Sequence, residues 1–184
     1  MQLYIMRHGE AHPPTNHSLT SDSERVLTKQ GEFEAKLMAT WLTKMNIGIG
    51  HLWVSPFVRA QQTCDIASKN MGVVAKTLDF ITPSGDAKQV HDFIDGFISN
   101  HLNDIRSNNT QLENMPLDNL APNDNNPKPL LIVSHMPLVS YLVAELTNYQ
   151  AAPIFATAAI AEIDYDINTM QGKLVRLISP LDLC

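Results

Sequence analysis

Short apolar runs alternate along the chain with longer segments in which apolar residues recur every three to four positions. The short runs are typical of buried strands, and the longer segments are typical of helices that pack one face on a sheet. The predicted strands are 3–6, 51–54, 71–78, 130–133, 158–166 and 173–179. Because helices separate the first four strands and a turn joins the last two, the pattern predicts an α/β fold with a mostly parallel central sheet and an antiparallel edge.

Capping residues mark the starts of two predicted helices. Thr28 is expected to cap a helix that begins directly after it. The residues predicted to form the apolar face of that helix are Phe33, Leu37, Trp41, Leu42 and Met45. Ser55 and Pro56 follow a strand directly, and they predict a second helix with Ser55 as N-cap and an end near residue 70. Two further helices are predicted over 86–102 and from Pro137 to Leu146.

The pattern fails between residues 103 and 129. This stretch is dominated by Asn, Asp, Ser and Pro, with only scattered apolar residues. It is too poor in hydrophobic residues to form a second core, so we interpret it as an irregular surface insertion. The length of 184 residues suits one domain, and we expect residues 1–184 to form a single domain that carries this insertion.

Composition and charge exclude several classes of protein. The formal net charge is −6, which argues against a nucleic-acid partner because such binding needs a basic face. Cys64 and Cys184 are the two cysteines, so neither a disulfide framework nor metal-ligand spacing is expected. The beginning of the chain has no signal-peptide pattern, and no apolar segment is long enough to span a bilayer. These features predict a cytoplasmic location and no membrane partner.

Polar side chains suited to a phosphoryl ligand follow three of the apolar strands. Arg7 and His8 end the first strand, Ser55 and Arg59 follow the second, and His135 follows the strand 130–133. Because the carboxyl ends of parallel strands meet at one edge of a sheet, we expect these side chains to converge. Two imidazoles and at least two guanidinium groups would then form a positive pocket, which favours phosphate binding or phosphoryl transfer.

Two other groups of residues are expected to lie near this pocket. Arg25 precedes the first helix, where it can either form a surface ion pair or turn into the crevice. Glu10, His12 and His17 carry metal-binding groups, but their spacing fits no defensible ligand pattern. We therefore expect no metal in this loop.

The three strand-end motifs occur in order along the chain. They are Arg7-His8-Gly9, Ser55-Pro56-x-x-Arg59-Ala60-x-Gln62-Thr63 and Ser134-His135-x-Pro137. This set resembles the histidine phosphatase superfamily, which includes phosphoglycerate mutases and acid phosphatases. The resemblance covers nearly the whole chain apart from 103–129, and it implies a three-layer, phosphoglycerate mutase-like sandwich.

Further motifs resemble one group within that superfamily, the SixA-type phosphohistidine phosphatases. They are Met6-Arg7-His8-Gly9-Glu10-Ala11, Arg25-x-Leu27-Thr28-x-x-Gly31 and Thr82-Pro83-x-Gly85-Asp86. The resemblance implies a monomeric enzyme that acts on the phosphohistidine of a histidine-containing phosphotransfer domain, which belongs to a sensor kinase in a two-component phosphorelay.

The resemblance also implies roles for the pocket residues. His8 would be the nucleophile that forms a phosphohistidine intermediate, and Arg7 and Arg59 would hold the phosphoryl oxygens. His135, Arg25 and Ser55 would add further contacts to the phosphate. No metal or organic cofactor is implied, because the arginines and histidines already supply positive charge. We expect His8 to attack as a neutral imidazole, with nearby cations lowering its pKa below about 6.5.

The identity of the leaving group stays open at this stage. Larger members of the superfamily carry an acid that protonates an alkoxide leaving group, and Asp86 and Glu10 are the candidates for that role here. If neither acts, an imidazole protonated on its other nitrogen can still leave as a neutral molecule, which favours phosphohistidine. The alternatives are a small-molecule phosphomonoesterase that uses one of these acids, and a catalytically silent module that binds phosphoproteins.

Overall fold

The computed structural model describes residues 1–14, 21–112 and 127–183. Its six-stranded sheet has the order β3-β2-β4-β1-β5-β6. The strands are β1 (Gln2–Arg7), β2 (His51–Val54), β3 (Ala75–Thr77), β4 (Leu130–Ser134), β5 (Ile160–Asp166) and β6 (Gln171–Ile178). Strands β1 to β4 pair in parallel, and β5 and β6 form the antiparallel edge. The predicted α/β sheet with an antiparallel edge is therefore confirmed, but the predicted strand 71–78 is shortened to Ala75–Thr77.

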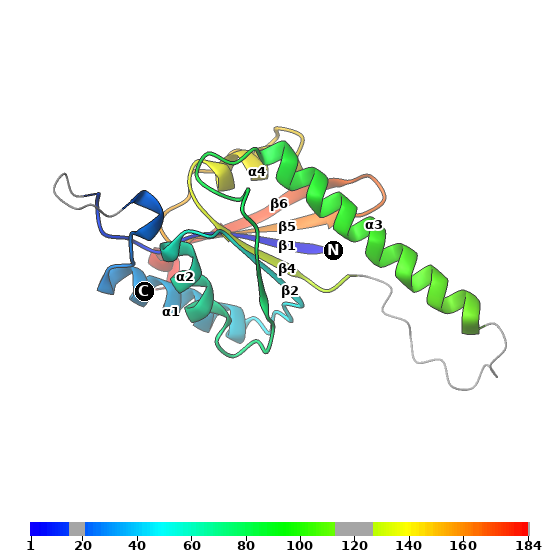
Figure 1. Cartoon of the computed structure of the whole chain (residues 1–184), viewed down its shortest axis with the longest axis horizontal. Helices are drawn as coiled ribbons and strands as arrows, with labels where there is room; N and C mark the ends of the chain where they lie inside the picture. Colours follow the sequence, from blue (N-terminus) through cyan, green and yellow to red (C-terminus); the bar gives the residue numbers. More distant parts are fainter. Residues whose placement is uncertain (15–20, 113–126, 184) are drawn as a thin grey trace.

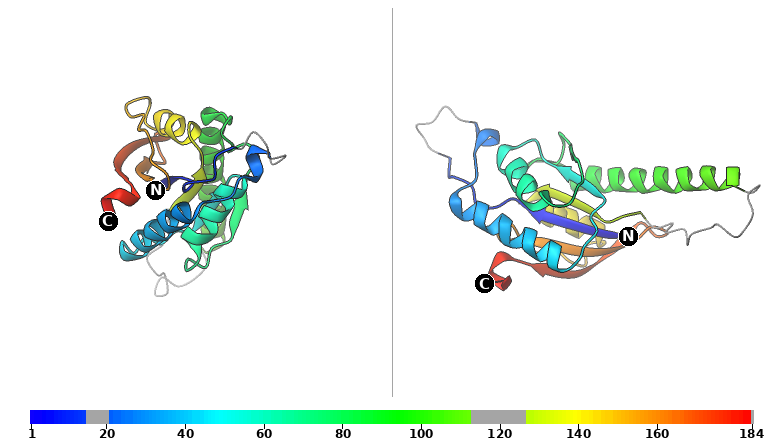
Figure 2. Two further views of the ribbon diagram at one scale, coloured as in Figure 1. Left: turned by 90° about the vertical axis from the view of Figure 1, so that its left-hand side faces the viewer. Right: turned by 90° about the horizontal axis from the view of Figure 1, so that it is seen from below.

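Helices cover both faces of this sheet and give three layers (Figures 1 and 2). The helices α1 (Lys29–Lys44) and α2 (Val58–Ser68) pack on one face, and α3 (Ala87–Leu112) and α4 (Leu138–Leu146) pack on the other. Each face has its own hydrophobic core: one contains Trp41, Leu42 and Met38, and the other contains Ile94 and Leu142. The central strands β1, β2 and β4 are buried on both sides, which explains their nearly continuous apolar sequences.

The register of the central strands aligns their carboxyl ends. In β1 and β4, Arg7 lies opposite Ser134, and in β2 and β4, Val54 lies opposite Val133. The residues that follow these three strands therefore leave the sheet at one level and at one edge, as the sequence predicts.

The structure corrects the predicted extent of α3. This helix does not end at residue 102 but runs to Leu112, through the first part of the segment interpreted as an irregular insertion. Its 26 residues span about 39 Å, and its second half projects beyond the sheet (Figures 1 and 2). Weak helix formers follow residue 102, but extending an existing helix costs far less than starting one. Residues 113–126 of the predicted insertion lie outside the described residues.

The predicted apolar face of α1 is only partly correct. Thr28 caps the helix as expected, because its hydroxyl accepts a hydrogen bond from the Gly31 amide at 3.0 Å. Trp41 and Leu42 are buried, but Phe33 and Met45 are exposed. Met38 takes a core position instead, since it lies on the same face as Trp41 and Leu42.

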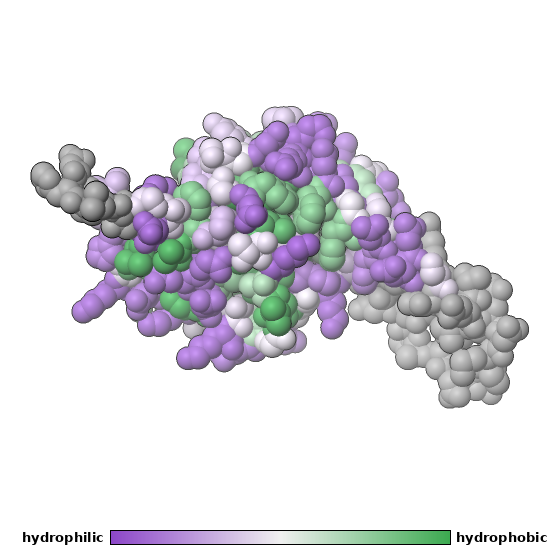
Figure 3. All heavy atoms as spheres, viewed as in Figure 1, coloured by the Kyte–Doolittle hydropathy of each residue, from purple (hydrophilic) through white to green (hydrophobic). Residues whose placement is uncertain are grey.

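The surface is mixed in character. On the face seen in Figure 3, hydrophobic residues gather in the middle and hydrophilic residues surround them. A groove of about 540 Å³ lies between α3 and the strands β2 and β3, and Trp53, Phe93 and Phe97 form part of its lining. Its lining includes none of the predicted pocket residues. Within the described ranges, no helix is both long and apolar enough to cross a membrane.

Candidate active site

The structure brings together His8, Arg59 and His135, which the sequence places after three different strands. The rings of His8 and His135 have centroids 5.0 Å apart, and Nε of Arg59 lies 3.2 Å from Nε2 of His8. All three side chains are buried, with exposed fractions of 8% for His8, 3% for Arg59 and 1% for His135. The predicted convergence at the carboxyl edge of the sheet is therefore observed.

The contacts of His8 define its tautomer. Nδ1 lies 2.7 Å from the carbonyl oxygen of Gly9, which can only accept a hydrogen bond, so Nδ1 carries the proton. Nε2 then holds a lone pair, and it accepts a hydrogen bond from Nε of Arg59. The lone pair of Nε2 is thus directed toward Arg59, inside the cluster.

Both imidazoles are held neutral. Burial is the main cause that lowers the pKa of His8, the hydrogen bond to Gly9 raises it, and the positive charges of Arg59, Arg7 and Arg25 lower it; together they bring it to about 4. The predicted direction is confirmed, but the predicted cause is incomplete, because burial has a larger effect than the cations. Burial also lowers the pKa of His135 to about 2. Neither ring therefore carries a proton on both nitrogens at neutral pH.

Close packing of two glycines holds the His8 turn in place. A Cβ atom added to Gly9 would lie 2.5 Å from the carbonyl oxygen of Gly31, at the start of α1. The amide of Gly9 also donates to Oγ1 of Thr63 at 3.0 Å, and that hydroxyl donates to the carbonyl of Arg59 at 2.7 Å. The turn that carries His8 is thereby tied to the helix that carries Arg59.

The start of α2 differs from the prediction. The helix begins at Val58 with Phe57 as its N-cap, so Ser55 does not cap it and Pro56 is not its first residue. Ser55 is fully buried, and its Oγ lies 2.7 Å from Nε2 of His135. It also accepts a hydrogen bond from the Phe57 amide at 3.4 Å. Ser55 therefore contacts His135, and Phe57 takes the N-cap position.

Two buried nitrogen atoms in the cluster lack a hydrogen-bond partner within the described residues. They are Nε of Arg7 and Nδ1 of His135. Arg7 is held by Nη1, which donates to the carbonyl of Phe155 at 2.7 Å. Buried polar groups without partners are unfavourable, so these nitrogens suit a site that an anion completes.

Arg25 was predicted either to form a surface ion pair or to turn into the crevice, and its position has features of both. Its Nε donates to the carbonyl of His12 at 2.6 Å, and its Nη1 forms an ion pair with Asp22 at 2.8 Å. Its charge still lowers the pKa of His8. Arg25 therefore lies at the edge of the pocket, but its guanidinium contacts a carboxylate there.

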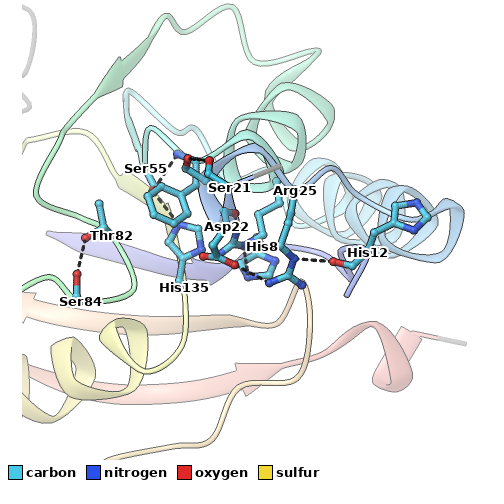
Figure 4. A network of polar contacts seen from close by, with 12 residues as sticks. His8, His12, Ser21, Asp22, Arg25, Ser55, Thr82, Ser84 and His135 are labelled. Atoms are coloured by element: carbon cyan, nitrogen blue, oxygen red, sulfur yellow. Dashed lines mark hydrogen bonds and ion pairs between the residues drawn. The ribbon is translucent and has the colours of Figure 1, made fainter. Parts of the chain in front are cut away.

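Sequence reasoning missed Asp22, the carboxylate that reaches the cluster (Figure 4). Its Oδ2 accepts from Nη2 of Arg59 at 3.0 Å, and its carbonyl accepts from Nη1 of the same guanidinium at 2.5 Å. The hydrogen bond to Arg25 is the main cause that lowers the pKa of Asp22. Ser21 and Glu24 form a capping box around the short 3₁₀ turn Asp22–Glu24, and this Ser-x-x-Glu pattern was the available sequence signal.

The two acids considered from the sequence stabilise helix starts instead. Asp86 accepts from the Lys88 amide at 2.8 Å, and Glu10 accepts from the Thr28 hydroxyl at 2.7 Å. In the described part of the chain, no group of three or more His, Cys, Asp or Glu side chains could hold a metal ion. Of the three metal-binding candidates, His17 lies outside the described residues. His12 is exposed, and its side chain points away from the cluster (Figure 4).

Comparisons with known proteins agree with this geometry. The family model described as "Histidine phosphatase superfamily (branch 1)" matches residues 3–81. Phosphohistidine phosphatase SixA of Escherichia coli is 35% identical over all of this chain and 96% of its own length. A SixA homolog of Haemophilus influenzae is 31% identical over 91% of this chain and 90% of its own.

Solved structures give the same result. The structure of the protein histidine phosphatase SixA complexed with tungstate matches all of both chains, with a TM-score of 0.78 and 33% identity. A putative α-ribazole-5′-P phosphatase from Escherichia coli shares the fold, with a TM-score of 0.62 and 17% identity. Because its likeness to SixA extends over its full length, in both sequence and fold, the chain belongs to the SixA-type phosphohistidine phosphatases of the histidine phosphatase superfamily.

Proposed function

We propose that this phosphatase removes the phosphoryl group from a phosphohistidine in a histidine-containing phosphotransfer domain of a two-component phosphorelay. The observation that carries the proposal is the environment of His8 Nε2. That nitrogen is unprotonated, lies in the buried cluster and accepts a hydrogen bond from Arg59 Nε, while Nδ1 donates to the Gly9 carbonyl. A neutral imidazole in this setting can attack phosphorus without a separate base.

In the first step, the lone pair of His8 Nε2 forms a bond to phosphorus as the bond between phosphorus and the substrate nitrogen breaks. The electron pair of the broken bond stays on the substrate imidazole. If that ring carries a proton on its other nitrogen, it leaves as a neutral molecule. The phosphorylated ring of His8 keeps its Nδ1 proton, and the Gly9 carbonyl stabilises the resulting positive charge.

In the second step, water attacks the phosphoryl group on His8. The bond between phosphorus and Nε2 breaks, its electron pair returns to Nε2, and a proton of the water passes to solvent. The products are inorganic phosphate and the neutral His8 ring with which the cycle began. Both steps therefore use the same tautomer, which the hydrogen bond to Gly9 maintains.

The remaining pocket residues stabilise charge on the phosphoryl oxygens. Arg59 and Arg7 supply guanidinium groups, and Nε of Arg7 and Nδ1 of His135 are buried without other partners among the described residues. Arg25 adds positive charge at the edge of the pocket. Ser55 acts through His135, whose Nε2 it contacts. Phosphoryl transfer depends mainly on positioning and charge stabilisation of this kind.

The acids of the site favour phosphohistidine over a phosphate ester. Glu10 and Asp86 are engaged at helix starts. The lowered pKa of Asp22 keeps it ionised at neutral pH, so it has no proton to give to an alkoxide. A neutral imidazole needs no such proton. The names of the SixA relatives support the same substrate class. The proposal also places the enzyme in the cytoplasm, as its cysteine content predicts.

A direct comparison of substrates tests this function. Wild type, His8→Ala and His12→Ala are assayed in EDTA on a phosphohistidine-bearing phosphotransfer domain and on an aryl phosphate. We expect faster loss of the protein-bound phosphate, which His8→Ala abolishes and His12→Ala leaves unchanged, because the His12 side chain is exposed and points away from the cluster.

Two other results would contradict the proposal. Turnover of the aryl phosphate alone would assign a small-molecule phosphomonoesterase. Binding of the phosphorylated domain without turnover would assign a silent binding module.

A further inference from the structure

Asp22 and His8 occupy the same edge of the Arg59 guanidinium. Nε and Nη2 form the edge of a guanidinium that binds two oxygen atoms of a phosphoryl group side by side. Here Nε donates to Nε2 of His8, and Nη2 donates to Oδ2 of Asp22. A carboxylate oxygen therefore lies beside the nucleophilic nitrogen, where a phosphoryl oxygen is expected to bind.

The exposure of these residues shows on which side of the pocket Asp22 lies. The side chain of Arg59 is 4% exposed and that of Asp22 is 53% exposed. Asp22 therefore lies on the solvent side of the cluster, which we call its mouth and from which a substrate would arrive and a leaving group depart. The other carboxylate oxygen, Oδ1, contacts Arg25 at 2.8 Å. When a phosphoryl group takes the edge of Arg59, the contact with Arg25 can keep the carboxylate at this mouth.

A fixed negative charge at the mouth affects two kinds of substrate differently. It repels the negative charge that develops on the oxygen of an ester leaving group. By contrast, it attracts an imidazole that carries an N–H group, because a carboxylate accepts a strong hydrogen bond from such a donor. Specificity often combines an attraction for one substrate with a repulsion of its competitor, and one carboxylate supplies both here.

We propose that Asp22 is a specificity residue that selects phosphohistidine against phosphate esters, by accepting a hydrogen bond from the second ring nitrogen of the substrate imidazole. This inference rests on the proposed function and adds the source of its selectivity. The hydrogen bond keeps the proton on that nitrogen, so the imidazole leaves neutral as the bond to phosphorus breaks. Arg25 is then a positioning residue for Asp22.

Asp22→Asn tests the proposal because it removes the charge and preserves the shape of the side chain. The values of kcat/KM for phosphoimidazole and for an aryl phosphate are measured with wild type and variant. We expect phosphoimidazole turnover to fall and aryl phosphate turnover to rise. The ratio of the two values should drop about tenfold or more, as expected when a hydrogen bond to a charged carboxylate is replaced by a weaker one to a neutral amide oxygen.

Glu24→Gln is the matched control. Glu24 belongs to the same 3₁₀ turn, but its carboxylate contacts Ser21 and no arginine within the described residues. This variant should leave the ratio unchanged. Inhibition by inorganic phosphate is measured in parallel, to show whether the Asn variant still forms the phosphate pocket.

The outcomes separate the two proposals. If Asp22→Asn changes both substrates by the same factor, Asp22 only competes with phosphate for the arginines, and the specificity role is overturned. The specificity role is also overturned if Asp22→Asn and wild type have the same kcat/KM for each substrate. If wild type shows no His8-dependent loss of phosphate from the phosphotransfer domain, the proposed function itself fails, and this inference fails with it.

Discussion

Oγ of Ser55 lies 2.7 Å from Nε2 of His135, although the two residues are 80 positions apart in the chain. Ser55 also accepts from the Phe57 amide, so its own hydroxyl proton is available for His135. If Ser55 donates to Nε2, the proton of the imidazole lies on Nδ1, which has no other partner in the described part of the chain. Nδ1 can then donate to a phosphoryl oxygen.

This relationship predicts the effect of Ser55→Ala. Without the hydroxyl, His135 is free to take the other tautomer, in which Nδ1 cannot donate. We expect kcat on phosphohistidine to fall about tenfold, the cost of one hydrogen bond in the transition state. Ser84→Ala is the control, because Ser84 is exposed and lies apart from the imidazoles (Figure 4). Equal activity of both variants would show that Ser55 does not set the tautomer.

The protonation state of His8 can be measured directly. Because burial and nearby arginines lower its pKa to about 4, the ring should stay neutral from pH 8 to pH 5. NMR titration of the protein with isotope-labelled histidine gives this value, and comparison with His8→Ala assigns the signal. A midpoint near 6.5, the ordinary value for histidine, would contradict the account of the buried nucleophile.

The same shift predicts how stability depends on pH. In the unfolded chain His8 takes up a proton near pH 6.5, whereas in the folded protein it does so near pH 4. The unfolded state therefore binds more protons between these values, and stability falls as pH drops from about 6.5 to about 4. His8 alone contributes a slope of at most about 1.4 kcal/mol per pH unit. Urea denaturation of wild type and His8→Ala measures it, and parallel pH profiles of the two proteins would rule it out.

Gly9→Ala should disrupt the His8 turn. Its Cβ would meet the Gly31 carbonyl at 2.5 Å, and backbone on both sides leaves little room to adjust. We expect a loss of stability of about 1–3 kcal/mol, together with a large loss of activity as His8 moves. Gly48→Ala is the control, because a Cβ there meets no atom within 4 Å. Thermal unfolding and turnover of both variants give the comparison, and equal behaviour would show that the contact between Gly9 and Gly31 does not hold the turn.

The parts of the site that lie at strand ends could be predicted from the sequence. Apolar runs locate the strands, and parallel strands place His8, Arg59 and His135 at one edge for reasons of geometry alone. Asp22 could not be placed in this way, because it belongs to a loop and reaches the cluster through two arginines from different segments. Its capping box predicts only a local turn.

Tertiary context also decides the other features that were wrong. Ser55 has the composition of an N-cap, but a buried imidazole competes for its hydroxyl. The last part of α3, up to Leu112, consists largely of residues with low helix propensity. Propensity alone therefore predicts that the helix ends near residue 102. In both cases the local preference of the residues is real, but interactions in the folded chain outweigh it.

Trapping the phosphorylated enzyme shows directly whether Nε2 of His8 accepts the phosphoryl group. The enzyme is mixed with a ³²P-labelled phosphohistidine domain, quenched in alkali within milliseconds, and analysed for the labelled residue and ring nitrogen. We expect the label on Nε2 of His8. Label on Nδ1 of His8 or on His135, or steady turnover with no labelled enzyme at any time, would contradict the account.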